Sequence, residues 1–319
     1  MDIIHYLNNN PPVLLGTFFL FGLLVGSFLN VVIYRLPIML ERAWQASIMQ
    51  ATLQTNTTES NVIQAAAQQA NTAQSTAQSI NTSSDAGEAP AFNLFTPGSH
   101  CPRCKQPVRV WQNIPILSYL LLRAKCARCK FPIDMRYPMV ELFTALLSVY
   151  VAMEFGAGLL TLTLLILIWS LIVLAFIDIE HQLLPDDITL PLLWLGLLTN
   201  TFVPGLGVST ADAIIGAAAG YTALWLFYQL FKLLTSKEGM GYGDFKLLAV
   251  LGAWLGWQSL LPIILIASLL GTLHGLCLIL VQGQDRNIPI PFGIFLTIAG
   301  IIVLFRGSDI IAFWLAFII

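Results

Sequence analysis

Two aspartates stand where apolar stretches meet short polar ones, and they give the strongest indication of chemistry in this sequence. Asp178 lies in FIDIEHQLLPD at the end of an apolar run, and Asp244 lies in GYGDFK just before another. Because a carboxylate at a membrane boundary is costly, each is expected to have a functional reason for its position. The apolar stretches between them bring both to the same face of the membrane, so we predict that the two residues share one site.

The predicted pair has the chemistry of an aspartic peptidase. Two neighbouring carboxyl groups do not both ionise easily, so one of them keeps a proton. The charged group can then draw a proton from water while the neutral group polarises a peptide carbonyl. Because a helix C-terminus disfavours negative charge and a helix N-terminus favours it, we expect Asp178 to hold the proton and Asp244 the charge.

The residues around the aspartates have simple structural explanations beside functional ones. Gly239, Gly241 and Gly243 would let a peptide approach the backbone closely, or would form a flexible turn between helices. Lys246 is expected to extend its charge to the membrane interface rather than to act in catalysis. The acidic residues after Asp178 would receive a basic substrate segment or form a solvated loop. They are Glu180, Asp186 and Asp187.

Four of the five cysteines form two C-x-x-C pairs, CPRC and CARC, with 21 residues between them. This spacing is typical of a tetrahedral zinc site with four cysteine ligands. Two disulfides are the alternative, but the charge distribution given below places these thiols in the reducing cytosol. Four ligands leave no open position for water, so we predict a structural metal that stabilises a region with a small core. The predicted ligands are Cys101, Cys104, Cys126 and Cys129; the fifth cysteine, Cys277, is expected to pack in the core.

Composition indicates a membrane protein. Of the 319 residues, 57% are hydrophobic and 10% are charged, and the mean hydropathy is +0.77. We predict an all-α polytopic membrane protein with about eight transmembrane helices, because several apolar stretches reach the ~20 residues that cross a bilayer. The second span carries Glu141, which is expected to face the interior of the helix bundle. The predicted spans are 13–34, 138–154, 159–177, 188–204, 212–232, 245–257, 260–281 and 291–306, and the apolar piece 310–319 should lie against the bundle or in the interface.

The basic residues predict the orientation in the membrane. Ten of the fifteen Lys and Arg residues lie between Arg35 and Tyr137, and with alternating spans all but Arg306 fall on one side. The positive-inside rule places that side in the cytoplasm and both termini outside. No Lys or Arg precedes the first span, so we interpret it as an anchor and not as a cleavable signal peptide. The net charge of −2 gives no indication of nucleic-acid binding.

The sequence divides into three predicted regions. Residues 1–34 form the first transmembrane segment, 35–137 a cytoplasmic region, and 138–319 the transmembrane region that holds both aspartates. Within the cytoplasmic region, 92–137 contains the zinc-binding module. Residues 47–90 are low in complexity and contain no aromatic, Lys or Arg residue. Such a segment buries too little apolar surface to offset its ordering entropy, so we expect a flexible insertion.

Four segments occur in order along most of the chain: GLLVGSFLNVVIYRLP at 22–37, the paired C-x-x-C knuckles, FIDIEHQLLPDDITLPLLWLGLL at 176–198, and GYGDFKLLAVLGAWLGW at 241–257. Together they resemble the type 4 prepilin peptidase family, which are bifunctional leader peptidases and N-methyltransferases. The G-x-G-D motif alone is weak, because it also occurs in presenilin-like intramembrane proteases. The resemblance implies that Asp178 and Asp244 are the catalytic residues and that the four paired cysteines bind zinc.

The resemblance also implies a substrate and a second reaction. The enzyme would act in the bacterial inner membrane and remove the short basic leader of type IV prepilins or pseudopilins, after a glycine, at the cytoplasmic face. It would then methylate the new N-terminal amine with S-adenosylmethionine, although the sequence contains no recognisable fingerprint for that cofactor. The expected partners are these precursors and the lipid bilayer, with no nucleic acid. The 47–90 insertion departs from the family because it is longer and richer in Gln and Ser.

Three other functions fit parts of the sequence. A G-x-G-D peptidase without methyltransferase activity, such as an archaeal preflagellin-type enzyme, would share the aspartates but not the knuckles and the large loop. A proton-coupled transporter would use the aspartates as relays, but transporters usually bind near the midplane between repeated halves. A zinc-dependent hydrolase would need an open coordination position, which four thiolates do not leave.

Overall fold

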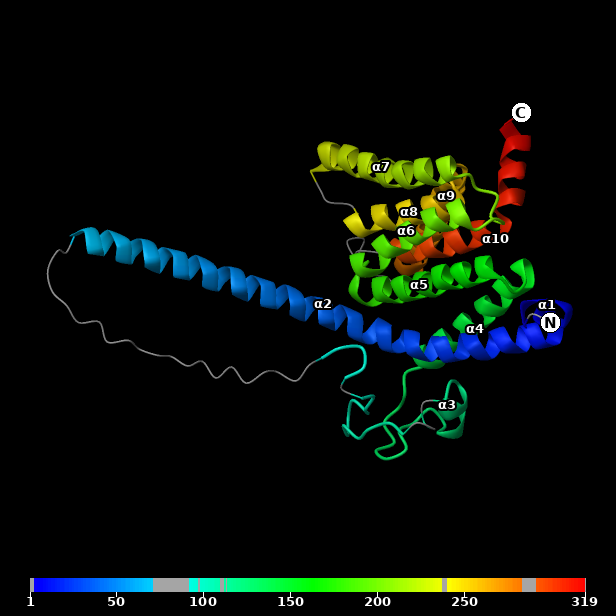
Figure 1. Cartoon of the computed structure of the whole chain (residues 1–319), viewed down its shortest axis with the longest axis horizontal. Helices are drawn as coiled ribbons and strands as arrows, with labels where there is room; N and C mark the ends of the chain where they lie inside the picture. The colour runs from blue at the N-terminus through cyan, green and yellow to red at the C-terminus, as the bar shows by residue number, and fades with distance from the viewer. Residues whose placement is uncertain are drawn as a thin grey trace. The chain divides into compact units, whose positions relative to one another are not determined.

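The structure of the chain, a computed structural model, consists of α-helices and their connections (Figure 1). It describes residues 3–70, 92–96, 98–109, 112, 114–236, 240–282 and 291–318. Across these ranges there are no β-strands, and extended residues pair only in two isolated bridges. The predicted all-α class is therefore confirmed. The chain divides into two units, Met1–Ile33 with His100–Ile319, and Tyr34–Ser99.

The larger unit contains both aspartates and all four paired cysteines. Its elements are α1 (Ile3–Asn9), the first part of α2 (Pro11–Ala70), α3 (Leu117–Leu121), α4 (Arg136–Phe155), α5 (Leu159–His181), α6 (Asp186–Phe202), α7 (Thr210–Thr235), α8 (Tyr242–Leu255), the 3-10 turn η2 (Trp257–Ser259), α9 (Leu260–Gln282) and α10 (Gly293–Ile318). Each predicted span coincides with one of the longer helices.

Five helical segments are long and apolar enough to cross a membrane, which confirms a multi-pass membrane protein. They are Pro11–Gln54, Arg136–Phe155, Leu159–His181, Thr210–Thr235 and Trp257–Val281. Two other helices, α6 and α8, have 17 and 14 residues, and the apolar part of α10 is the short stretch Gly293–Gly307. The exact number of eight crossings stays a prediction.

The core of this unit lies around α5 and α8. Helix α5 packs between α4 on one side and α6 and α10 on the other (Figure 1). Helix α8 packs against α6, α7 and α10, and from Asp244 to Leu255 every side chain except Lys246 is buried. A helix that is apolar on all sides must be surrounded by others. The two helices that carry the aspartates are thus the most enclosed ones.

Glycines let neighbouring helices approach closely. On α2, a methyl group built on Gly22 would lie 2.6 Å from Ala145 Cα of α4, and one on Gly26 would lie 2.7 Å from Glu141 Cα. Gly216 of α7 and Gly252 of α8 face each other, and a methyl group on either would collide with the carbonyl oxygen of the other. Small residues at such crossings are typical of membrane helix bundles, where packing replaces the hydrophobic effect.

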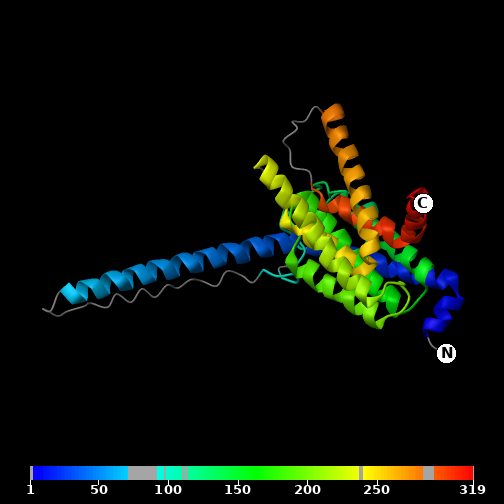
Figure 2. The same ribbon diagram turned by 90° about the horizontal axis from the view of Figure 1, so that it is seen from above.

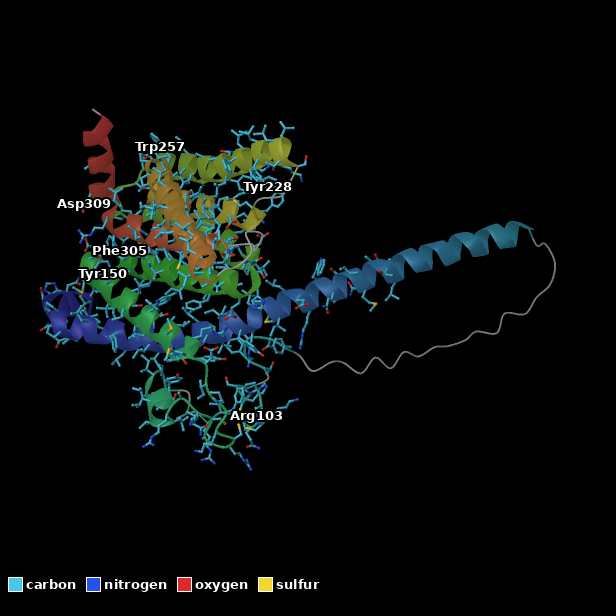
Figure 3. All side chains as sticks on the ribbon, turned by 180° about the vertical axis from the view of Figure 1, so that it is seen from behind. Arg103, Tyr150, Tyr228, Trp257, Phe305 and Asp309 are labelled. Atoms are coloured by element: carbon cyan, nitrogen blue, oxygen red, sulfur yellow. The ribbon has the colours of Figure 1, made fainter. Side chains whose placement is uncertain are left out.

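The end of the chain differs from one expectation. Helix α9, orange in Figure 2, stands at a steep angle to its neighbours, and most of its apolar surface is exposed. Cys277 of α9 is exposed, so the expectation that it packs in the core is wrong. The apolar piece after residue 310 continues α10, which changes direction before its C-terminus (Figure 1). The earlier part of α10 packs on α4, with the rings of Tyr150 and Phe305 4.3 Å apart (Figure 3).

The smaller unit contains the predicted flexible insertion, and the described part of that insertion is helical. Helix α2 continues through Ala70, so residues 47–70 are helical, while 71–91 lie outside the described residues. Alanine and glutamine are good helix formers, and a polar segment that extends an existing helix has no new nucleus to form. Within this unit, Arg35 donates a hydrogen bond to the Asn93 carbonyl oxygen (2.9 Å), and the Arg42 guanidinium lies 4.2 Å from the centre of the Phe92 ring.

Candidate active site and metal centre

Asp178 belongs to the last turn of α5. The helix runs on to His181 and ends at Gln182, whose backbone is left-handed (φ 51°). Asp178 follows a buried apolar run from Leu171 and is itself only 5% exposed. Its carboxyl group is therefore removed from water, and it can carry a negative charge only if hydrogen bonds stabilise that charge.

Asp244 belongs to the first turn of α8. Gly241 caps this helix, and Asp244 is 7% exposed although it stands near the helix end. The Gly241 N–H also interacts with the Asp244 carboxyl group, because the third residue of a helix can reach back to its N-cap. The carboxyl groups of Asp178 and Asp244 are close enough to interact electrostatically. The structure thus brings together the two residues that the sequence singled out.

Helix α10 supplies a third part of the site, which sequence reasoning missed. The Ile294 N–H donates a hydrogen bond to Asp178 Oδ2 (3.1 Å), and the Gly293 N–H interacts with the same carboxyl group. A glycine at the start of an apolar run is a recognisable signal for a helix start. The contact with Asp178, however, joins residues 116 positions apart and is visible only in the folded chain.

Leu184 packs between the two glycines nearest the aspartates. A methyl group built on Gly243 would lie 2.7 Å from Leu184 Cβ, and one on Gly293 would lie 3.1 Å from Leu184 Cδ1. Packing therefore requires a glycine at position 243. Position 241 is more open, because the nearest atom to a methyl group there would be Asp244 Oδ2, 4.0 Å away. The expectation for Gly239 lies outside the described residues.

Two ion pairs flank the aspartates. Lys246 donates hydrogen bonds to both oxygens of Asp186 at 2.6 and 2.7 Å, which ties α8 to the start of α6. Arg136 of α4 pairs with Glu180 of α5. Lys246 thus has a protein partner, and its expected position at the membrane interface stays a prediction. Two of the three acidic residues after Asp178 already have a cation. The third, Asp187, is exposed.

The four paired cysteines form one cluster. Their Sγ atoms all lie within 4.8 Å of one another, and Cys101 Sγ is 3.7 Å from Cys129 Sγ. All are free thiols. Zinc–sulfur bonds of about 2.3 Å in a tetrahedron separate sulfur atoms by roughly 3.8 Å, so the donor set fits a metal such as zinc. The Cys129 and Arg128 backbone N–H groups lower the pKa of the Cys126 thiol to about 6, which favours the thiolate form that binds metal.

The two knuckles have the same local structure because their sequences repeat as C-x-R-C-K-x-P. In the first, which carries Arg103 (Figure 3), the Lys105 N–H donates to the Cys101 carbonyl oxygen at 2.9 Å; in the second, Lys130 does the same to Cys126 at 3.1 Å. Both lysines have left-handed backbones, with φ of 52° and 57°. Each knuckle is thus a tight turn that presents its two sulfurs together.

A buried carboxylate attaches this module to the helix bundle. Glu141 of α4 is 8% exposed, which confirms that it faces the interior, and its Oε2 accepts a hydrogen bond from the Ile116 N–H (2.7 Å). Ile116 precedes α3 and has a φ of 55°, which is rare for a β-branched residue. The sequence predicted that Glu141 is buried but not that its partner lies next to the cysteine module.

Comparisons with known proteins cover nearly the whole chain. Residues 20–155 match the Bacterial Peptidase A24 N-terminal domain, and residues 165–276 match the Type IV leader peptidase family. A prepilin leader peptidase/N-methyltransferase of Aeromonas hydrophila is 49% identical over 305 residues, 96% of this chain and 95% of that protein. Proteins of the same name from Stutzerimonas stutzeri and Pseudomonas aeruginosa are each 46% identical over 317 residues, 99% of both chains. No solved structure matches.

Proposed function

This chain belongs to the type IV leader peptidase family, and we propose that Asp178 and Asp244 are the residues with which it hydrolyses peptide bonds. One observation carries the proposal: two buried carboxyl groups from separate helices meet near the ends of those helices. Burial near a like charge is the arrangement in which one carboxyl group stays protonated and its neighbour stays charged. Such a pair has both groups that acid–base hydrolysis needs.

Peptide hydrolysis by this pair would proceed in two stages, each with two proton transfers. The charged carboxylate takes a proton from water as the water oxygen attacks the peptide carbonyl carbon, while the protonated carboxyl gives its proton to the carbonyl oxygen. The tetrahedral intermediate then breaks its C–N bond. The leaving amine takes up a proton from the acid that was just formed, and a hydroxyl group of the intermediate returns its proton to the other carboxylate as the C=O bond re-forms. Both aspartates return to their starting protonation state.

The proposed substrate fits the position of the pair. We propose type IV prepilin or pseudopilin precursors, as the names of the relatives suggest. Such a precursor has an apolar helix that diffuses in the plane of the membrane, with a basic leader beside it. Its scissile bond would reach the helix ends where Asp178 and Asp244 lie, and exposed Asp187 would be available to the basic leader.

The second reaction and the metal belong to the same proposal. The relatives are named N-methyltransferases, so S-adenosylmethionine would be the methyl donor; no residue is assigned to it. Zinc on Cys101, Cys104, Cys126 and Cys129 would be structural, because four thiolates close the coordination sphere. We propose residues 138–319 as the peptidase region, with both termini periplasmic and the knuckles in the cytoplasm of a bacterial inner-membrane protein.

Mass spectrometry of a pilin precursor tests these proposals directly. The purified full chain is incubated with the precursor with and without S-adenosylmethionine, beside Asp178→Asn. Wild type should yield a shortened, singly methylated product, and the variant should leave the precursor intact. A shortened product that never gains a methyl group would support the G-x-G-D peptidase without methyltransferase activity. No shortening of any of several precursors by folded protein would contradict the substrate proposal and reopen the transporter alternative.

A further inference from the structure

The backbone at the start of α10 holds one of the two aspartates and not the other. Asp178 Oδ2 accepts the Ile294 N–H at 3.1 Å and also interacts with the Gly293 N–H. Asp244 has the single N–H of Gly241. The free N–H groups in the first turn of a helix favour a bound negative charge, and Gly293 and Ile294 begin α10. The two carboxyl groups are therefore not equivalent.

The close approach depends on a glycine at position 293. A methyl group built on Gly293 would lie 2.7 Å from Asp178 Oδ2 and 3.1 Å from Asp178 Cγ. Since real Cβ atoms rarely come so close, any other residue would push the carboxylate away from α10. The backbone N–H groups reach Asp178 only because no side chain stands between them.

Among the described residues, no cation on the helices packed against α5 pairs with the Asp178 carboxylate. Arg136 of α4 is paired with Glu180, and Lys246 of α8 is paired with Asp186 of α6. Helix α10 has no ionisable residue before Arg306. His181, on α5 itself, lies 4.0 Å from Glu180. Asp244 is the remaining ionisable neighbour, and only one of the two carboxyl groups readily carries a negative charge.

We infer that Gly293 and Ile294 are positioning residues that keep Asp178 as the charged member of the pair. On this assignment, which rests on the proposed peptidase function, Asp178 takes the proton from the attacking water and Asp244 gives its proton to the peptide carbonyl. This is the reverse of our expectation from the helix ends. That expectation considered each aspartate's own helix, whereas the deciding donors come from a third helix.

A matched pair of glycine variants tests this inference. Gly293→Ala should lower kcat for precursor cleavage by roughly 10- to 100-fold, because hydrogen bonds to a charged group are lost. It should also move the acidic limb of the kcat/KM profile to higher pH, since the charged form of Asp178 loses its donors. The control is Gly300→Ala, about two turns further along the same helix. A methyl group there would lie 2.5 Å from Leu251 Cδ2, so it costs packing without touching the aspartates.

A second variant keeps the test valid if Gly293→Ala does not fold. Replacing the Ile294 residue by the corresponding α-hydroxy acid converts its N–H to an ester oxygen and changes no side chain. It should reproduce the pH shift. The inference fails if either folded variant keeps the wild-type pH profile, or if Gly300→Ala shifts it equally. If the wild-type protein cleaves no precursor, the proposed function is contradicted and not this inference. The variants are compared with wild type, so the inference is tested only on an active enzyme.

Discussion

The aspartate pair and the cysteine cluster are assembled in opposite ways. Asp178 and Asp244 come from different helices, and a third helix supplies the hydrogen bonds that distinguish them. The cysteines come from two short turns with the same sequence pattern and the same backbone hydrogen bonds. The first site depends on how long helices pack, and the second largely on local turns. Changes at the first should therefore affect chemistry, and changes at the second should affect stability.

The largest expected effect is the loss of cleavage on removing either carboxylate. Asp178→Asn and Asp244→Asn should each reduce kcat/KM by at least about 10²- to 10⁴-fold, because the acid or the base is lost. Both changes keep the size of the side chain, so the thermal unfolding midpoint in detergent should change little. Cleavage at the wild-type rate by either folded variant would show that the two residues do not form the catalytic pair.

The cysteine cluster should give the opposite result. Cys101→Ser should lower the metal content and the unfolding midpoint, and activity should then decay as the protein unfolds rather than stop at once. Chelation of the metal from wild type should follow the same slow course. Cys277→Ser is the control, because that cysteine is exposed and lies outside the cluster. An immediate stop of cleavage on chelation, with the fold intact, would instead indicate a catalytic metal.

Glu141 tests whether the module and the bundle are energetically linked. Glu141→Gln weakens a 2.7 Å hydrogen bond from Ile116 to a buried carboxylate. The expected cost is about 1–3 kcal/mol of unfolding free energy, with faster amide exchange around α3. Glu154→Gln, an exposed position on the same helix, is the control. Equal stability of both variants would mean that the module is held to the bundle by other contacts.

The smallest effect is expected from deleting residues 47–90. Both sites belong to the other unit of the chain, and Arg42 already lies 4.2 Å from the Phe92 ring, so the ends to be joined are close together. Precursor cleavage measured by mass spectrometry should stay near the wild-type rate. A deletion variant that folds but does not cleave would show that this segment has a role beyond a linker.

Local patterns in the sequence were sufficient for much of the fold and for the candidates. Apolar runs mark helices because crossing a bilayer needs a set length of apolar residues, and each expected span falls on a helix. The cysteine knuckles are equally local, since C-x-R-C-K-x-P encodes its own turn. Low complexity in residues 47–70 does not indicate how far α2 extends, although alanine and glutamine favour helix.

What the sequence by itself determined is therefore the set of parts: the apolar helices, the sulfur ligands, and two carboxylates at helix boundaries. Only the tertiary structure decided their relations. It placed the Ile294 N–H on Asp178, Asp186 on Lys246, and Ile116 on Glu141. The physical reason is that helix formation and tight turns depend on neighbouring residues, whereas these contacts depend on how close glycines allow distant helices to pack.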